Sequence, residues 1–170
     1  MIPRFVCCYL ISGNLAYRKT TKQSSTYWKW DSKLAVDGNR ASNMTRYQSC
    51  SQTLSKPQST CTASGSNWWM VDMEESYEIG RVVVVSNAGC CGKREREWRG
   101  RSRNFTYKTC HFYEGKLEAA QVKTVYCNPD ARGRYLVIFA PASYQLTLCE
   151  VEVFERFQFA FVSIFFFFFF

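Results

Sequence analysis

Two adjacent residues near the end of the chain, Cys149 and Glu150, could carry out two kinds of chemistry. A cysteine can join its strand covalently to an earlier segment, and a carboxylate can bind a hard cation. The obvious partner segment lies much earlier in the chain, where the turn sequence Asp37-Gly-Asn39 is followed by Cys50. We therefore expect these two parts of the chain to meet and to define the domain.

The residue types that most often act as catalysts do not form a catalytic set in this sequence. The only histidine, His111, adjoins Cys110, which we expect to be in a disulfide, so no Cys/His nucleophile pair is expected. Asp72, Glu74 and Glu75 are close in sequence, but they lie at a predicted strand end and in a polar turn. The sequence therefore favours a binding or structural protein over an enzyme.

A basic run at residues 93–103 supplies much of the net charge of +8. Arginines beside Trp98 could bind nucleic acid, heparin or an anionic lipid. Glu95 and Glu97 interrupt the run, however, and this pattern is more typical of a solvated loop. We therefore expect no nucleic-acid partner, and retention on heparin would revive that alternative.

The chain contains nine cysteines, and they do not form the Cys-x-x-Cys pairs or His/Cys clusters of a zinc module. Such a cysteine content is typical of secreted proteins that contain disulfides. The sequons Asn43-Met-Thr45 and Asn104-Phe-Thr106 agree with that compartment, although a sequon alone is a weak signal. The sequence therefore predicts an extracellular, secreted protein.

Composition and patterning favour an all-β domain. Aromatic residues make up 17% of the chain, and no long stretch shows convincing helical periodicity. Residues 81–86 form the most convincing buried strand, and residues 74–80 are predicted to be a polar connection before it. The other predicted strands are residues 68–73, 104–110, 123–127, 133–139 and 146–154. About eight short strands with linked ends predict a β-sandwich or jelly roll.

The first part of the domain is predicted to be less regular. Residues 14–25 are polar and β-prone, as is typical of a first strand or an extended arm. Trp28 and Trp30 alternate around Lys29, so an extended segment would place both rings on one face. Residues 42–65 are rich in Ser, Thr, Gln and Asn, and we expect them to form a surface loop.

The two ends of the chain are predicted to lie outside the domain, which we place at residues 14–155. Residues 1–13 resemble the end of a secretory signal, and a truncated signal or a mis-called start is the alternative. Residues 156–170 form an apolar tail that ends in six phenylalanines, which we interpret as translated non-coding sequence rather than native structure. The tail is shorter than the ~20 residues of a membrane-spanning helix, so no membrane span is expected; a hydrophobic anchor is the alternative.

A series of short motifs along the chain is more specific than any one of them. The motifs are Asn14-Leu-Ala, Gln23-Ser-Ser25, Ala35-Val-Asp-Gly-Asn39, Ser49-Cys50, Trp68-Trp69-Met-Val-Asp72, Cys90-Cys91, Asn104-Phe105, Cys127-Asn-Pro129, Gly133-Arg-Tyr135 and Leu146-Thr-Leu-Cys-Glu-Val-Glu-Val-Phe154. In this order the series resembles the F-type lectins, or fucolectins, over Asn14 to Phe154. The resemblance implies a discoidin-like jelly-roll β-sandwich of about eight strands, stapled by disulfides.

The resemblance also implies three disulfide bonds, and these are Cys50 with Cys149, Cys110 with Cys127, and Cys90 with Cys91. The first would close the longest loop, which the chain-entropy model values at about 4–5 kcal/mol. The third would join adjacent residues in a strained bond whose flat sulfur face can pack on the apolar edge of a sugar. Free thiols or other pairings are the alternative there. Cys7, Cys8 and Cys61 remain without an assigned partner.

A calcium site is implied where the first loop meets the last strand. Calcium takes about six to eight oxygen ligands, from backbone carbonyls and carboxylates. The implied ligands are the carbonyls of Leu34, Asn39, Ser49 and Cys149 and the carboxylates of Asp37 and Glu150. In the alternative, Asp37 only caps the turn and Glu150 pairs with a surface Lys or Arg.

The sugar-binding positions implied by the resemblance are Gln52, Asn87, Cys90, Cys91 and Arg94. The family uses a histidine where this chain has Gln52, and an Arg-x-Asp motif whose two ends here are Asn87 and Gly89. Only Arg94 keeps a basic group, and Arg101 is the alternative if the long loop shifts the register. Amides can still bond sugar hydroxyls, but neutral donors contribute about 0.5–1.5 kcal/mol rather than about 1.5–3 kcal/mol. This degenerate fucose triad leaves the sugar specificity open.

The sequence as a whole predicts a secreted, calcium-dependent carbohydrate-binding domain of the F-type lectin kind. Its expected partners are glycans, either fucosylated or other cell-surface sugars, with self-association as a route to avidity. The alternative is a discoidin-like protein-binding or structural adhesion module that kept the scaffold and lost sugar binding. A glycan array separates the two, since only the lectin would bind sugars.

Overall fold

The computed structural model describes residues 13–55, 66–89, 108–111, 117–140 and 144–156. Several of the predictions lie outside these ranges, and they concern the two chain ends, the basic run 93–103, and Cys7, Cys8, Cys61, Cys90, Cys91, Arg94, Arg101 and Asn104. The domain bounds of 14–155 stay a prediction.

Within the described residues the chain is built almost wholly of antiparallel strands. In order, the elements are β1 (Thr20–Gln23), the 3₁₀ helix η1 (Ser32–Ala35), α1 (Met44–Tyr47), β2 (Ser51–Gln52), β3 (Asn67–Val85), β4 (Val122–Tyr126), β5 (Arg132–Ala140), β6 (Thr147–Leu148) and β7 (Glu150–Glu155). The predicted all-β class is confirmed. Neither helix in these ranges has the length and apolar character needed to cross a membrane.

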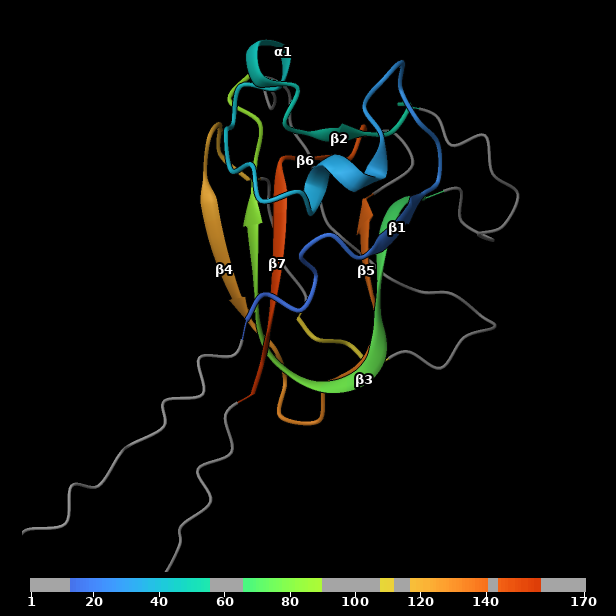
Figure 1. The fold of residues 1–170 in the computed structure, drawn as a ribbon, viewed down its shortest axis with the longest axis vertical. Helices are drawn as coiled ribbons and strands as arrows, with labels where there is room; N and C mark the ends of the chain where they lie inside the picture. Colours follow the sequence, from blue (N-terminus) through green and yellow to red (C-terminus); the bar gives the residue numbers. More distant parts are fainter. Residues whose placement is uncertain (1–12, 56–65, 90–107, 112–116, 141–143, 157–170) are drawn as a thin grey trace, which may run out of the picture.

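Strand β3 is the centre of the fold because it belongs to two layers (Figure 1). Its first half lies between β1 and β5, and its second half lies between β4 and β7. Trp69 and Val71 from the first half share one buried core with Val82 and Val84 from the second half. The two halves therefore face each other across the core, as expected for the predicted discoidin-like sandwich.

The prediction of a polar connection at residues 74–80 is wrong, because β3 continues through this stretch. The strand bends there instead: its register with β5 shifts between Asp72 and Tyr77, and Glu74 adopts a left-handed φ of 71°. Residues 74–76 are exposed at this bend. The polar pattern therefore marks the outer side of a bend rather than the end of a strand.

The predicted closing strand at residues 146–154 is two strands that belong to different sheets. Strand β6 pairs with β2, whereas β7 pairs with β3. Cys149 lies between them, and its N–H donates to the carbonyl of Val85 at 2.9 Å. The apolar residues of the stretch are buried as predicted, and these are Leu146, Leu148, Val151 and Val153.

The other strand predictions are mostly confirmed. Residues 81–85 of the predicted strand 81–86 lie in β3, residues 133–139 lie in β5, and residues 123–126 lie in β4. Residues 108–110 were predicted to end a strand, but they form none. The Cys110 carbonyl accepts a loop hydrogen bond from the Asn128 N–H at 2.8 Å, not a bond within a sheet.

The first part of the domain is more regular than predicted. Within residues 14–25 the strand is β1, and the predicted surface loop contains α1 and β2. The side-chain oxygen of Asn43 begins α1 by accepting a hydrogen bond from the Arg46 N–H at 3.1 Å. This is an N-cap, which satisfies a donor that the first turn of a helix leaves without a partner.

The start of the described chain is joined to the last strand. The Leu15 N–H donates to the carbonyl of Val153 at 2.8 Å. In return, the Val153 N–H donates to the side-chain oxygen of Asn14 at 2.9 Å. The predicted link between the first and last segments is therefore confirmed.

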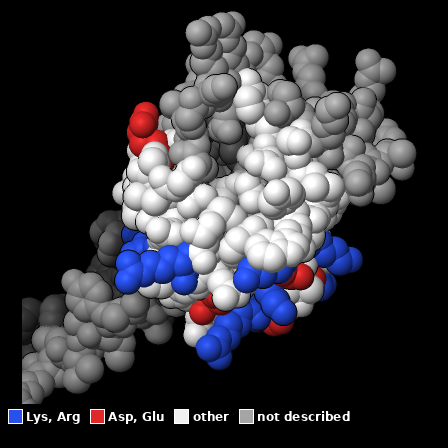
Figure 2. Space-filling model, turned by 90° about the horizontal axis from the view of Figure 1, so that it is seen from above, with Lys and Arg blue, Asp and Glu red and all other residues white. Residues whose placement is uncertain are grey.

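One end of the sandwich carries α1, β2, β6 and the loop between β1 and η1 (Figure 1). This end, here named the upper end, comprises residues 24–31, 42–52, 85–89 and 144–148. Seen from above, the described surface is largely uncharged, and most of the Lys and Arg side chains in view gather along one edge (Figure 2). The upper end therefore combines three exposed charged residues, Lys29, Asp31 and Arg46, with the exposed aromatic rings of Tyr27, Trp28 and Tyr47.

Candidate functional site

The predicted disulfide between Cys50 and Cys149 is confirmed. It joins the residue before β2 to the residue between β6 and β7. Both cysteines are fully buried, and they pack with Trp30, Met44 and Val85 in a second apolar cluster. The bond therefore fastens the loops of the upper end to the sheet.

The predicted disulfide between Cys110 and Cys127 is also confirmed. Asn128 secures the same place, because its side-chain amide donates to the Thr109 carbonyl at 3.0 Å. His111 follows Cys110 and is exposed. Since Cys110 is in a disulfide, it offers no free thiol for His111 to activate.

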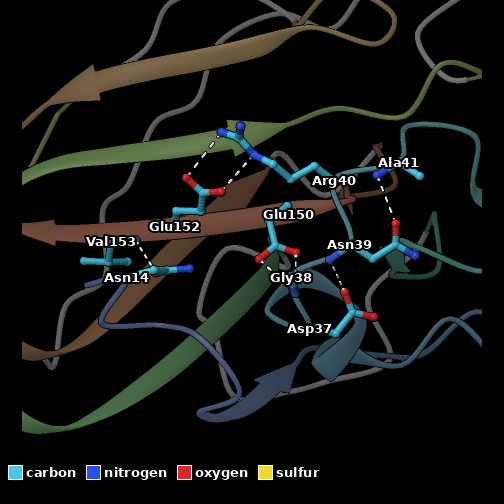
Figure 3. A network of polar contacts seen from close by, with 9 residues as sticks. All are labelled: Asn14, Asp37, Gly38, Asn39, Arg40, Ala41, Glu150, Glu152 and Val153. Atoms are coloured by element: carbon cyan, nitrogen blue, oxygen red, sulfur yellow. Dashed lines mark hydrogen bonds and ion pairs between the residues drawn. The ribbon is translucent and has the colours of Figure 1, made fainter. Parts of the chain in front are cut away.

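The loop after η1 is shaped by Gly38 and by hydrogen bonds within the loop (Figure 3). Gly38 has a φ of 87°, and a Cβ there would lie 2.9 Å from a ring carbon of Tyr17. The Asp37 carboxylate accepts from the Asn39 N–H at 2.8 Å, and the Asn39 side chain accepts from the Ala41 N–H at 3.1 Å. Asp37 therefore does cap the turn, and its carboxylate is held in the loop.

Glu150 is fully buried, and its two carboxylate oxygens lie 3.3 and 3.2 Å from the Gly38 nitrogen. Burial, and then the negative charge of Asp37, raises the pKa of Glu150 to about 8. Arg40, the arginine of this loop, binds Glu152 rather than Glu150, at 2.8 and 3.3 Å (Figure 3). Glu150 therefore faces the loop as a buried carboxylate.

The six residues predicted to bind calcium all lie in the described part of the chain, and they are Leu34, Asp37, Asn39, Ser49, Cys149 and Glu150. The disulfide joins the segment of Ser49 to that of Glu150, and the Gly38 N–H joins Glu150 to the loop of Asp37. Leu34 packs against the disulfide cluster.

The donor set at this place fits a hard cation that takes oxygen ligands. Across the described ranges, no three His, Cys, Asp or Glu side chains form a metal-binding group, so a cation would depend on two carboxylates and on carbonyls. A buried, ionised carboxylate beside a second one is unfavourable unless a proton or a cation compensates its charge. Glu150 is buried and lies near the negative charge of Asp37, so its ionised form requires such compensation.

Two of the five predicted sugar-binding residues, Gln52 and Asn87, lie in the described residues, and both are at the upper end. Gln52 is half-buried, and its side-chain amide donates to the Gln145 side-chain oxygen at 3.2 Å. Asn87 is 5% exposed, accepts from the Gly89 N–H at 3.1 Å, and has its amide nitrogen 2.9 Å from the Met44 sulfur. Gln52 therefore keeps access to solvent, whereas the Asn87 amide is bonded inside the fold.

The sequence did not indicate that Trp28 would be exposed at this end. The predicted extended segment with Trp28 and Trp30 on one face is wrong, because residues 28–29 form a turn closed by the Trp30 N–H and the Tyr27 carbonyl at 3.2 Å. Trp28 is 76% exposed and Trp30 is 4% exposed, although their rings touch edge to face with centroids 6.0 Å apart. The only feature of the sequence that could have suggested the exposure of Trp28 is its place within a polar stretch.

Comparison with known proteins shows the family. A family model described as a NedA-like, galactose-binding domain of the F5/F8 type C class matches residues 34–138. Fucolectin-6 of Anguilla japonica is 32% identical over 152 residues, which cover 84% of this chain and 76% of that protein. The chain belongs to the F-type lectin, or fucolectin, family.

Solved structures agree with this membership. The fucolectin from striped bass (Morone saxatilis) serum gives a TM-score of 0.68 at 25% identity, and the match covers 85% of this chain and 49% of that one. A fucose-binding module of Streptococcus pneumoniae gives 0.65 at 25% identity, with 85% and 96% covered. The fucolectin-family chain thus spans about half the length of the striped bass lectin. The predicted family and the discoidin-like jelly-roll fold are both confirmed.

Proposed function

We propose that this member of the fucolectin family is a secreted, calcium-dependent carbohydrate-binding domain whose sugar site is at the upper end. The observation that carries the proposal is the family membership: the relatives are fucolectins, and a fucose-binding module shares the fold. The upper end supports it, because sugars are bound through amides, hydroxyls and aromatic faces, and Gln52, Tyr27 and Trp28 offer such groups there. In this proposal the protein binds sugars without altering them, so it is not an enzyme.

The sugar preference is proposed to depart from that of a fucose binder with the full triad. Gln52 stands where the resemblance implies a histidine, and the Asn87 amide is bonded to Gly89 and adjoins Met44. The bonding of Asn87 favours the second candidate, a discoidin-like module that binds protein and has lost sugar binding. The two candidates differ in whether any glycan is bound.

On a glycan array, the oxidised and calcium-loaded protein should bind a restricted set of glycans. One free monosaccharide should compete for this binding, and Gln52→Ala should weaken it roughly two- to tenfold, as expected for the loss of one neutral hydrogen bond. Tyr126→Ala, exposed on β4, is a control outside the upper end and should change nothing. Uniform silence of the array would reject the lectin function and leave the protein-binding module.

The calcium site is proposed to lie between the loop of Asp37 and Glu150. The residues that would hold the ion are those predicted from the sequence, namely Leu34, Asp37, Asn39, Ser49, Cys149 and Glu150. When bound, the ion would supply the positive charge that two neighbouring carboxylates require. In the protein itself, Gly38 positions the loop against Glu150, and the disulfide holds β7 beside β2 through Cys149. This arrangement supports the loops that lead to the upper end.

Secretion is proposed from the two disulfides and from an exposed sequon at the upper end. Asn43 is exposed, and its side-chain oxygen accepts from the Arg46 N–H at 3.1 Å and from the Thr45 hydroxyl at 3.0 Å. Because the oxygen forms the helix cap, a glycan on the amide nitrogen would leave the cap intact.

Protein secreted from eukaryotic cells should therefore carry an N-glycan on Asn43. Thr45→Ala should remove one glycan while Asn43 stays as the cap, and Thr45→Ser should retain it. Intact-mass measurement before and after glycosidase treatment checks the result. Equal glycan mass in wild type and Thr45→Ala would show that Asn43 is not modified.

A further inference from the structure

The exposure of Trp28 is unusual for the largest apolar side chain. The residue is 76% exposed, while its neighbour Trp30 is 4% exposed in the cluster around the disulfide. A large aromatic side chain in water forgoes the stabilisation that burial gives, so its exposure is informative. Packing inside the domain does not explain the position of this indole.

The backbone of Trp28 is also unusual, because its φ is 52°. A left-handed conformation is unfavourable for a bulky residue, and it persists only where the surroundings impose it. Here the turn is held on β2: the Tyr27 N–H donates to the Gln52 carbonyl at 2.9 Å, and the Gln52 N–H donates to the Trp30 carbonyl at 3.0 Å. The Gln23 amide adds a bond to the Trp30 carbonyl at 3.0 Å. The fold therefore holds the indole outward at a defined place.

The surroundings of the indole are suited to a sugar. Gln52 and Tyr27 are bonded through the backbone, so the turn is continuous with the proposed sugar site. Tyr27 is 45% exposed, and the Lys29 ammonium lies 4.8 Å from the centre of the Trp28 ring. A pyranose has an apolar C–H face and a rim of hydroxyls, which match an aromatic face with nearby hydrogen-bond donors.

We propose that Trp28 is a stacking platform for a second sugar residue of an oligosaccharide whose first sugar binds beside Gln52. The inference rests on the proposed carbohydrate-binding function and adds a chain-length preference to it. Trp28 contributes the apolar contact, and polar groups come from Lys29, whose ammonium lies over the ring, and from the exposed Tyr27 that precedes Trp28 in the chain. The domain should therefore prefer oligosaccharides to their terminal monosaccharides.

Titration of Trp28 variants with an oligosaccharide selected on the array, and with its terminal monosaccharide, tests the inference. Trp28→Ala should weaken oligosaccharide binding about tenfold, as expected for the loss of one aromatic stacking contact, and leave monosaccharide binding within about twofold. Trp28→Phe should retain most of the affinity but lose the blue shift of tryptophan emission that the oligosaccharide produces in the wild type. Tyr126→Ala is the matched control, since Tyr126 is 71% exposed on β4 and should affect neither ligand.

The outcomes separate the inference from the proposed function. If Trp28→Ala binds the oligosaccharide as tightly as the wild type, the inference is overturned while the function stands. An equal loss for monosaccharide and oligosaccharide would place Trp28 in the first site and also overturn it. A wild-type protein that binds no glycan would overturn both. Unchanged melting temperatures confirm that the exposed substitutions leave the fold intact.

Discussion

Replacing Cys50 and Cys149 together by alanine should lower the free energy of unfolding by about 4–5 kcal/mol. The bond spans a sequence separation of 99 residues, so it removes much of the conformational entropy of the unfolded chain. For a domain of this size, the loss corresponds to a fall in melting temperature of roughly 10–20 °C. Both cysteines are fully buried among apolar side chains, and alanine adds no polar group there.

The matched control is the double alanine variant of Cys110 and Cys127. Their sequence separation is 17 residues, for which the same entropy model gives about 3 kcal/mol. Urea unfolding of the oxidised proteins should therefore rank the Cys50/Cys149 variant as the less stable of the two. The opposite order would contradict the role of this disulfide as the main tie between the two ends of the domain.

Millimolar calcium should raise the melting temperature of the wild type, and Glu150→Gln should abolish most of this rise. A ligand that binds only the folded state adds about 2.7 kcal/mol at a hundred times its dissociation constant. Glutamine keeps the size of the buried side chain but lacks the charged oxygens that calcium prefers. Glu152→Gln is the control, because Glu152 binds Arg40 and should leave the calcium response intact. Thermal unfolding in calcium and in EGTA measures the effect.

In EGTA, the wild type should lose stability as the pH rises. The pKa of Glu150 is about 8 in the folded protein, above its ordinary value of 4.5, so between these values the folded state binds more protons than the unfolded chain. The stabilisation from the protonated carboxyl is full below about pH 4.5 and is lost as the pH rises through about 8.

Glu150→Gln should therefore become more stable relative to the wild type between about pH 5 and pH 9 in EGTA. The variant thus loses the response to calcium and also loses the destabilisation at high pH. A full calcium response in Glu150→Gln, or a stability difference from wild type that does not change with pH, would contradict the account of this site.

The meeting of the two chain segments could be predicted because cysteine pairing and carboxylate chemistry depend on few residue types. Glu150 and Glu152 alternate along β7, and both contact the loop of residues 36–41. Their different roles could not be predicted, since only the fold shows that Gly38 covers Glu150 while Arg40 reaches Glu152.

The errors arise where tertiary contacts override the local pattern. Residues 74–80 are polar, yet pairing with neighbouring strands keeps them within β3. Asn87 has an amide suited to a sugar, but Gly89 and Met44 lie against it inside the fold. The spacing of the two tryptophans suggested an extended strand, whereas bonds to β2 impose a turn on Trp28.

The most direct test of the proposed function is one glycan array probed with the oxidised wild-type chain in calcium and again in EGTA. The account predicts selective, saturable binding in calcium, competed by a free sugar, and a marked loss of that binding in EGTA. Silence in both buffers would contradict carbohydrate binding by this domain, and equal binding in both would contradict its dependence on calcium.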